Sequence, residues 1–324
     1  MVKARLVGTG SFVPKKVLTN LDLEKMVETS DAWISARTGI RERRIATKDS
    51  TSEMAAKAGK AALKAAGVAP KDIDLIVVGT VTPDMTFPSS ACFVQSHLGV
   101  RSGAAAFDVS AACSGFLYAL DVANKYITSG AARKALVIGA DRFSRLVDWN
   151  DRATCVLFGD GAGAVVLSAE KGGHGVLSCR VHSDGKHWEM LYADSPCPPS
   201  PFESRAPRSP YLKMNGNETF KLAVRTMGSA INEVMEETGL KPEDISLLIP
   251  HQANLRIINA ARERLKLPED KVFTNLDKYG NTSAGSIPIA LDEAVRLGRV
   301  KNNDIILFVS FGGGLTWASA AVRW

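Results

Sequence analysis

Short apolar runs alternate with amphipathic stretches along this 324-residue chain. Apolar runs of strand length, bounded by turn residues, are typical of strands buried on both faces of a sheet. Four such runs predict strands: Leu75–Gly79, Ala135–Gly139, Ala164–Leu167 and Ile305–Val309. Between them, Ser50 followed by Glu53 has the form of a helix capping box, and apolar positions repeat with a helical period from about Glu218 to Glu237. The alternation predicts an α/β protein with buried sheets.

The chain also repeats itself at long range. The segment Ala66–Ile76 (AGVAPKDIDLI) resembles Thr238–Leu248 (TGLKPEDISLL), and further matches follow in the same order. In both segments a helical pattern ends at glycine, a proline-containing turn follows, and a strand begins. The common order predicts two copies of one α/β unit. We therefore expect residues 1–172 to form an N-terminal half and residues 173–324 a C-terminal half.

The segment Lys186–Tyr211 breaks this pattern because it contains six prolines. Proline has no backbone N–H to donate, so the segment cannot form a regular helix or a central strand. It lies between the two predicted halves. We expect a long surface loop that acts as a linker or borders an active site.

Composition narrows the function classes. The formal charge of +6, from 40 Lys and Arg against 34 Asp and Glu, permits anionic partners without indicating nucleic acid. The five cysteines include no Cys-x-x-Cys pair and the five histidines are scattered, so we expect no metal site. The N-terminus carries no apolar run of signal-peptide length, and no segment has the ~20 apolar residues of a membrane helix. The sequence therefore predicts a cytoplasmic protein without a membrane span.

Cys113 is the first candidate for chemistry. It lies in the run Asp108–Leu120, where small residues follow a strand that ends near Val109 and precede a helical pattern. This position is near a helix N-terminus, where the helix dipole and free N–H groups favour a nucleophilic thiolate. A buried structural cysteine fits the same pattern, because free cysteine is among the most buried residue types. The run alone leaves both interpretations open.

Two further turns carry polar side chains between a strand and a helix. His251 follows the apolar run Leu247–Pro250, and Asn281 lies within Tyr279–Ser286. Taken singly, each fits a hydrogen-bonded loop residue or a helix cap. The repeat relates the Cys113 turn to the Asn281 turn. If the halves pack as pseudo-symmetric partners, a nucleophile, a base or donor, and an amide converge in one crevice.

Six stretches, in this order, resemble the signatures of the β-ketoacyl-acyl carrier protein (ACP) synthase III family of thiolase-superfamily condensing enzymes. They are Trp33–Arg43, Ala111–Gly115, Phe158–Gly163, Pro250–Arg256, Tyr279–Ala284 and Phe311–Trp317. The resemblance implies the five-layered αβαβα thiolase fold, built from two duplicated halves. Elongating synthases carry a second histidine where this chain has Asn281. Thiolases use a second cysteine late in the chain, and no cysteine follows Cys197 here.

The resemblance also implies a reaction. Cys113 would attack the thioester of an acyl-CoA primer, expected to be acetyl-CoA, while the N–H groups of Cys113 and Gly313 hold the oxyanion. Malonyl-ACP would then lose CO2, and its enolate would accept hydrogen bonds from His251 and Asn281. Attack on the acyl-cysteine would give a β-ketoacyl-ACP and initiate fatty acid synthesis. This chemistry needs no metal and no cofactor besides the coenzyme A thioester.

Binding residues follow from the same resemblance. Trp33 would stack on the CoA adenine, with Arg37 and Arg152 near it, and Phe87 would close the acyl pocket of the partner in a homodimer. Four basic side chains are candidates for docking acidic ACP: Lys221, Arg256, Arg262 and Arg264. A core tryptophan and solvated arginines fit the same positions.

Two other functions are compatible with these residues. An enzyme of the same fold could transfer an acyl group to a small-molecule amine or hydroxyl without decarboxylation. A non-catalytic protein of the same fold could bind acyl-CoA or ACP. Release of CO2 from malonyl-ACP distinguishes the first alternative, and acylation of the protein by acetyl-CoA distinguishes the second.

Overall fold

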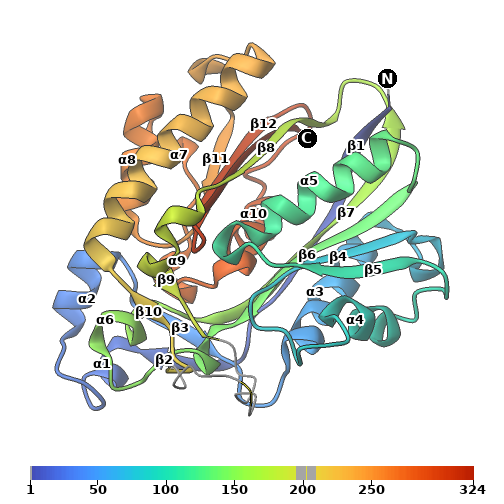
Figure 1. Ribbon diagram of the computed structural model, residues 1–324. Coiled ribbons are helices and arrows are strands. Elements are labelled where there is room, and N and C mark those ends of the chain that lie inside the picture. Colours follow the sequence, from blue (N-terminus) through green and yellow to red (C-terminus); the bar gives the residue numbers. More distant parts are fainter. Residues whose placement is uncertain (1, 195–201, 203–208) are drawn as a thin grey trace.

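The computed structural model describes residues 2–194, 202 and 209–324, and two sheets dominate it (Figure 1). The five-stranded sheet has the order β1-β7-β6-β4-β5 and the four-stranded sheet the order β11-β12-β13-β8. The first sheet comprises β1 (Val2–Phe12), β4 (Leu75–Gly79), β5 (Ala105–Val109), β6 (Lys134–Arg142) and β7 (Asp160–Lys171). The second comprises β8 (Gly175–Ser183), β11 (Leu247–Pro250), β12 (Ile305–Gly312) and β13 (Thr316–Arg323).

Helices form three layers around these sheets (Figure 1). Helices α5 (Gly115–Thr128) and α10 (Ser286–Arg296) lie in the central layer, where their apolar side chains pack with residues of both sheets. Helix α3 (Thr51–Ala66) and α4 (Ser90–Leu98) cover the outer face of the five-stranded sheet. Helix α7 (Gly216–Thr238) and α8 (Leu255–Leu265) cover the outer face of the other sheet. This arrangement confirms the predicted five-layered fold.

The four predicted strands are present and buried on both faces. In β4, Leu75 and Val77 join the core around α5, whereas Ile76 and Val78 join the core under α3. Successive side chains of a strand point to opposite faces, so a strand between two helical layers must be apolar throughout. This is why these strands are continuous apolar runs without alternation.

The predicted capping box is confirmed at the start of α3. The Ser50 hydroxyl accepts a hydrogen bond from the Glu53 N–H at 3.3 Å, and the Glu53 carboxylate accepts one from the Ser50 N–H at 2.7 Å. The helix ends at Gly67, which has the left-handed φ of 63° that glycine adopts most easily. The second predicted helix is α7, which extends the interval from Glu218 to Glu237 by one or two residues at each end.

The two central helices carry matching ion pairs. Asp121 of α5 pairs with Lys125 at 2.5 Å, and Asp292 of α10 pairs with Arg296 at 2.9 Å, each with i, i+4 spacing. The two sheets draw their strands from residues 2–171 and 175–323 respectively. Both features accord with a duplicated unit, and the division into halves at residue 172 stays a prediction.

Shorter elements form a cap beside the sheets, around a small apolar core that includes Leu23, Ile34 and Phe158. They are β2 (Lys16–Thr19), α1 (Asn20–Leu23), α2 (Asp31–Thr38), β3 (Glu42–Ile45), α6 (Arg152–Cys155), β9 (Leu191–Tyr192), β10 (Lys213–Met214) and α9 (Leu276–Tyr279). In the proline-rich segment the described part contains a short 3-10 stretch, Gly185–Met190, and the two-residue β9. Most of the predicted loop lies outside the described residues.

Candidate active site

Two strained turns stand at the starts of the two central helices. Cys113 lies in a 3-10 turn between β5 and α5, and its neighbour Ala112 has a φ of 46°. The corresponding turn before α10 contains Ser283, with a φ of 50°. Positive φ is uncommon in residues other than glycine and persists only where the surrounding structure holds it. Corresponding turns in the two halves therefore share the same unusual backbone.

Each turn is pressed against a glycine from a sheet of the other predicted half. A β-carbon on Gly312 of β12 would lie 2.6 Å from the Cys113 nitrogen, and one on Gly139 of β6 would lie 2.0 Å from the Ala284 carbonyl oxygen. The two turns also meet each other, because a β-carbon on Gly115 would lie 3.2 Å from the Ala284 β-carbon. The N-terminal ends of α5 and α10 therefore meet at one point.

Asn281 is held from its backbone and from its side chain. Its N–H donates to the Leu157 carbonyl at 2.9 Å, and its own carbonyl accepts from Gly159 N–H at 3.0 Å. The side-chain Oδ1 accepts from the Ser283 N–H at 2.8 Å. With Oδ1 so engaged, the Nδ2 end is the donor, and the Asn281 amide lowers the pKa of the Cys113 thiol as a nearby hydrogen-bond donor does. The structure thus brings Cys113 and Asn281 together.

His251 is fixed as a neutral imidazole. Its Nδ1 lies 2.6 Å from Ser286 Oγ at the start of α10, and both side chains are buried. Burial lowers the pKa of His251 to about 3. Ser286 Oγ also accepts from the Gln252 N–H at 3.5 Å, and a hydroxyl with one proton and two lone pairs can either donate to His251 Nδ1 or accept from it. In the tautomer in which Ser286 donates to Nδ1, Nε2 carries the imidazole proton and acts as a donor.

The environment of Cys113 differs from the expectation of a stabilised thiolate. The side chain is 5% exposed, and burial raises the pKa of the thiol to about 12. Asp141 also raises this pKa, whereas Ser283 and Asn281 lower it. The loss of solvent therefore outweighs the helix N-terminus, and the resting group is a thiol. Burial therefore acts against the thiolate that the helix N-terminus favours.

Three residues of this site were missed by the sequence analysis. Asp141 is fully buried at the end of β6 and accepts a hydrogen bond from the Ala284 N–H at 3.1 Å. Ser283 and Ser286 contribute the contacts described above. The available signal for Asp141 is a carboxylate placed two residues after the predicted buried strand Ala135–Gly139. The two serines lie inside the turn that was identified through Asn281.

The structure gathers the three candidate CoA-binding residues. The guanidinium carbons of Arg37 and Arg152 lie 4.9 and 5.0 Å from the centre of the Trp33 ring. Such distances are typical of cation–π contacts. Arg152 also donates to the Glu28 carbonyl at 2.9 Å and lines a surface pocket with Asn150. The cluster brings two cationic side chains to one aromatic ring.

The candidate ACP-docking residues lie on the packed pair α7 and α8. The Arg256 guanidinium stands 5.0 Å from the Phe220 ring, and Lys221 pairs with Glu218 at 2.8 Å. Arg264 lies along α7, because a β-carbon on Gly228 would lie 3.4 Å from its side chain. The fourth residue, Arg262, lies on α8 and is partly buried. Asn254 at the start of α8 donates to the Arg37 carbonyl at 3.1 Å, which connects this helix with the Trp33 cluster.

The roles of Phe87 at the partner's acyl pocket and of Gly313 in the oxyanion hole stay predictions. Phe87 is 81% exposed in the connection between β4 and α4, as expected of a side chain that reaches a partner. Gly313 follows the glycine that contacts Cys113, and a β-carbon on it would lie 2.7 Å from the Leu191 carbonyl oxygen. The close approach of main chain at both glycines requires residues without side chains.

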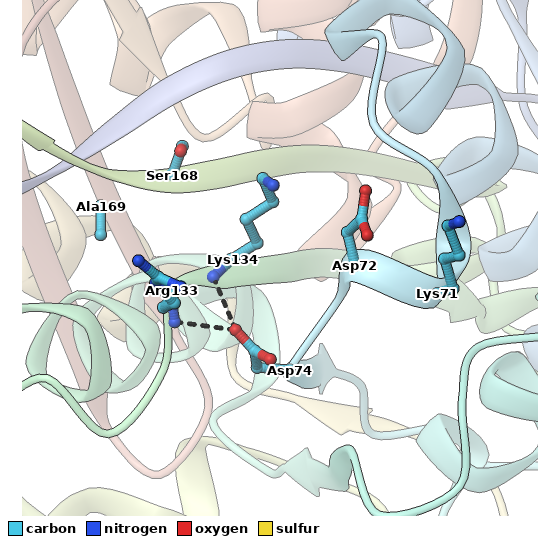
Figure 2. Close-up of a pocket in the computed structure, with 7 residues that line it drawn as sticks. All are labelled: Lys71, Asp72, Asp74, Arg133, Lys134, Ser168 and Ala169. Atoms are coloured by element: carbon cyan, nitrogen blue, oxygen red, sulfur yellow. Dashed lines mark hydrogen bonds between the residues drawn. The ribbon is translucent and has the colours of Figure 1, made fainter.

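The surface pocket drawn in Figure 2 is remote from these groups. It lies at the amino-terminal ends of β4 and β6, whereas Cys113 follows the carboxyl-terminal end of β5. Asp74 in this pocket accepts hydrogen bonds from the N–H groups of Arg133 and Lys134, drawn as dashed lines in Figure 2. Its other lining residues are Lys71, Asp72, Ser168 and Ala169. The pocket contains none of the candidate site residues.

Neither a metal cluster nor a membrane span is found in the part of the chain that the structure describes. Within residues 2–194, 202 and 209–324, no three His, Cys, Asp or Glu side chains are grouped so that they could hold a metal ion. Over the same residues, every helix is too short or too polar to cross a bilayer.

Comparison with known proteins identifies the family. The model of the 3-oxoacyl-[acyl-carrier-protein] synthase III family matches residues 107–185, and the model of its C-terminal part matches residues 235–324. The β-ketoacyl-[acyl-carrier-protein] synthase III of Caldanaerobacter subterraneus subsp. tengcongensis is 54% identical, over 100% of this chain and 98% of that protein. The synthase III of Aquifex aeolicus is 52% identical, over 99% of both chains.

Solved structures give the same result. The crystal structure of the Aquifex aeolicus 3-oxoacyl-[acyl-carrier-protein] synthase III superimposes with a TM-score of 0.93 at 51% identity, covering 99% of this chain and 100% of that one. The Thermus thermophilus synthase III superimposes with a TM-score of 0.93 at 48% identity, covering 98% of each chain. By fold, by full-length similarity and by the turns that carry its candidate active site, the chain belongs to the β-ketoacyl-ACP synthase III family of thiolase-fold condensing enzymes.

Proposed function

We propose that the protein condenses an acyl-CoA primer, expected to be acetyl-CoA, with malonyl-ACP to give a β-ketoacyl-ACP, CoA and CO2, and so initiates fatty acid synthesis. The full-length relatives at 54% and 52% identity bear the name of this enzyme. The structural observation that carries the proposal is the meeting of the Cys113 and Asn281 turns at the N-terminal ends of two central helices. A protein that only binds acyl groups does not require a nucleophile there.

In the first half-reaction, Cys113 takes the acyl group. Its sulfur attacks the thioester carbonyl carbon, the bond from that carbon to the CoA sulfur breaks, and the thiol proton leaves with CoA as CoA-SH. The backbone N–H groups of Cys113 and Gly313 are proposed to hold the oxygen while it carries negative charge. Because the resting thiol has a pKa raised to about 12, attack and proton loss must be closely coupled.

In the second half-reaction, His251 and Asn281 serve decarboxylation. The carbon–carbon bond to the malonyl carboxylate breaks, CO2 leaves, and the electron pair forms an enolate on the ACP thioester. The neutral His251 Nε2–H and the Asn281 Nδ2 donor are proposed to bind the enolate oxygen, with bonds that strengthen as charge develops. The enolate carbon then attacks the acyl-Cys113 carbonyl, and the cysteine sulfur leaves as a thiolate that takes up a proton from solvent to restore the thiol.

The remaining assignments complete the proposal. The cluster of Trp33, Arg37 and Arg152 binds the CoA nucleotide, and the basic side chains of α7 and α8 dock the acidic carrier. The reaction uses no cofactor beyond the CoA thioester. The two halves divide near residue 172. We also propose a cytoplasmic location, which cell fractionation tests.

We further propose a homodimer in which Phe87 reaches the acyl pocket of the partner. Phe87 is the most exposed aromatic side chain of the first half, as this role requires. Light scattering at micromolar concentration tests the dimer, and a mass near the monomer value of 34.7 kDa would contradict it.

The test of the whole reaction is to supply acetyl-CoA and malonyl-ACP and to measure CO2 and the ACP product together. The proposal expects CO2 and β-ketoacyl-ACP in equal amounts. Acyl transfer to a small amine or hydroxyl without CO2 would favour the alternative acyltransferase. Binding of acyl-CoA without any covalent adduct would favour a non-catalytic protein.

A further inference from the structure

Asp141 is a buried carboxylate that takes no part in the proposed bond-making steps. It lies at the end of β6 with no exposed surface, and its two oxygens receive hydrogen bonds from different parts of the chain. Oδ1 accepts from Thr80 Oγ1, Val81 N–H, Thr82 N–H and Thr82 Oγ1, over distances of 2.9 to 3.2 Å. Oδ2 accepts from the Ala284 N–H at 3.1 Å. The carboxylate therefore joins the loop after β4 to the turn before α10.

The strand β6 contacts both the N–H and the carbonyl group of Ala284 in that turn. Asp141 accepts the Ala284 N–H, while Gly139 lets the Ala284 carbonyl approach so closely that a β-carbon would lie 2.0 Å from the oxygen. The preceding residue, Ser283, has the positive φ of 50° and donates its own N–H to Asn281 Oδ1. A backbone conformation of this kind needs surroundings that determine it. The chain of contacts leads from Asp141 through Ala284 and Ser283 to the amide of Asn281.

We infer that Asp141 is a positioning residue whose carboxylate holds the Ser283–Ala284 turn, and through it the Asn281 donor, in the geometry that decarboxylation requires. The inference rests on the proposed function, because the role is defined by the decarboxylation half-reaction. Asp141 itself touches neither the acyl group nor the enolate in this scheme.

Burial raises the pKa of Asp141, whereas the hydrogen-bond donors around it favour the ionised form, and this ionised form acts against the nucleophile. Asp141 lies close enough to Cys113 to raise the pKa of the thiol, and so it opposes formation of the thiolate. Any contribution of Asp141 to catalysis must therefore come from its hold on the Ser283–Ala284 turn. Removing the charge should make Cys113 easier to ionise while it releases Asn281. A residue that only stabilises the fold would affect both half-reactions in the same direction.

The variant Asp141→Asn is suited to this distinction. The amide oxygen can replace Oδ1 among its four donors, which places the NH2 group opposite the Ala284 N–H, where two donors face each other. We expect decarboxylation of malonyl-ACP to fall about 100-fold, the loss that a misplacement of about 1 Å commonly causes. Alkylation of Cys113 by iodoacetamide should not slow, and its pH profile should move to lower pH.

Asp292→Asn is the matched control. Asp292 is 1% exposed on α10 and accepts hydrogen bonds from Thr9 and Ser11, away from the turn. This variant should lose thermal stability and keep both half-reactions. If Asp141→Asn does not fold, Thr82→Ala loosens the same carboxylate by removing one Oδ1 donor. We then expect a smaller loss of decarboxylation, again without slower alkylation of Cys113.

Parallel loss of alkylation and decarboxylation in the Asp141 or Thr82 variant, or unchanged decarboxylation in Asp141→Asn, would overturn the inference. Failure of the wild-type protein to accept acetyl or to release CO2 would instead reject the proposed function. The wild-type assay therefore distinguishes the two failures.

Discussion

Gly312 and Cys113 are in such close contact that a β-carbon on Gly312 would lie 2.6 Å from the Cys113 nitrogen and 3.1 Å from its β-carbon. Real β-carbons do not approach backbone nitrogen so closely, so Gly312→Ala must displace the nucleophile turn. We expect acylation by acetyl-CoA to slow by about 100-fold or more, because such displacement spoils the geometry of attack. Stopped-flow release of CoA from the folded variant measures this effect.

Gly173→Ala is the control for that substitution. A β-carbon at Gly173 would meet nothing within 4 Å, and its φ is not in the left-handed region. This variant should acylate at the wild-type rate. Equal rates for Gly312→Ala and Gly173→Ala would show that the Gly312 contact does not constrain the nucleophile.

The buried thiol of Cys113 should show no titration near neutral pH. With its pKa raised to about 12, the thiolate fraction grows about tenfold per pH unit throughout the neutral range, and alkylation depends on the thiolate. The rate of Cys113 alkylation should therefore rise continuously from about pH 6 to about pH 9. The exposed Cys92 would compete, so the measurement uses a Cys92→Ser background with peptide mapping. A plateau that begins near neutral pH would indicate a stabilised thiolate instead.

His251 should destabilise the fold in acid. Its pKa is lowered from 6.5 to about 3 by burial, so the folded protein resists protonation that the unfolded chain accepts. The stability that neutral His251 contributes is complete above pH 6.5 and is lost as the pH falls toward 3. Melting curves of the wild type and of His251→Gln should converge over this interval. If both proteins lost stability in parallel, His251 would not be the titrating group.

Docking of the acidic carrier should depend on Arg256. This exposed side chain is held over Phe220 at the edge of the α7–α8 pair. Arg256→Glu should raise the Michaelis constant for malonyl-ACP, mostly through slower association, and should leave acylation by acetyl-CoA nearly unchanged. Exposed charges are screened over about 8 Å at physiological salt, so raising the salt concentration should have the same effect on the wild type.

Lys60→Glu on α3 provides the matched charge reversal, because this exposed lysine lies in the opposite outer layer. It should leave both Michaelis constants unchanged. If Arg256→Glu instead lowered the melting temperature and impaired both half-reactions, the role of Arg256 would be to stabilise its helix and not to bind the carrier.

The sequence predicted the features that depend on local pattern. The strand Leu75–Gly79 and the Ser50 capping box were found with their correct bounds, since apolar runs and cap residues act over a few positions. The repeat and the six signatures also led to the five-layered fold. Each of these signals lies within a short segment or in the order of such segments.

The rest depends on contacts between distant segments. The hydrogen bond from Ala284 to Asp141 joins residues 143 positions apart, and no local pattern encodes it. The ionisation of Cys113 depends on distant segments in the same way. A helix start is visible in the sequence, but the burial that raises the thiol pKa comes from segments such as Gly312 that pack on it only after folding.

The central claim is that Cys113 carries the acyl group while His251 and Asn281 serve decarboxylation. The most direct measurement is a mass spectrum of the enzyme and of malonyl-ACP from the same reaction, for the wild type and for Cys113→Ala, His251→Ala and Asn281→Ala. When acetyl-CoA is supplied before malonyl-ACP, the account predicts one acetyl group on Cys113 of every protein except Cys113→Ala. It also predicts that decarboxylation falls ~100- to 1,000-fold in His251→Ala and Asn281→Ala. An adduct that survives Cys113→Ala, or His251 and Asn281 variants that lose acylation but keep decarboxylation, would contradict it.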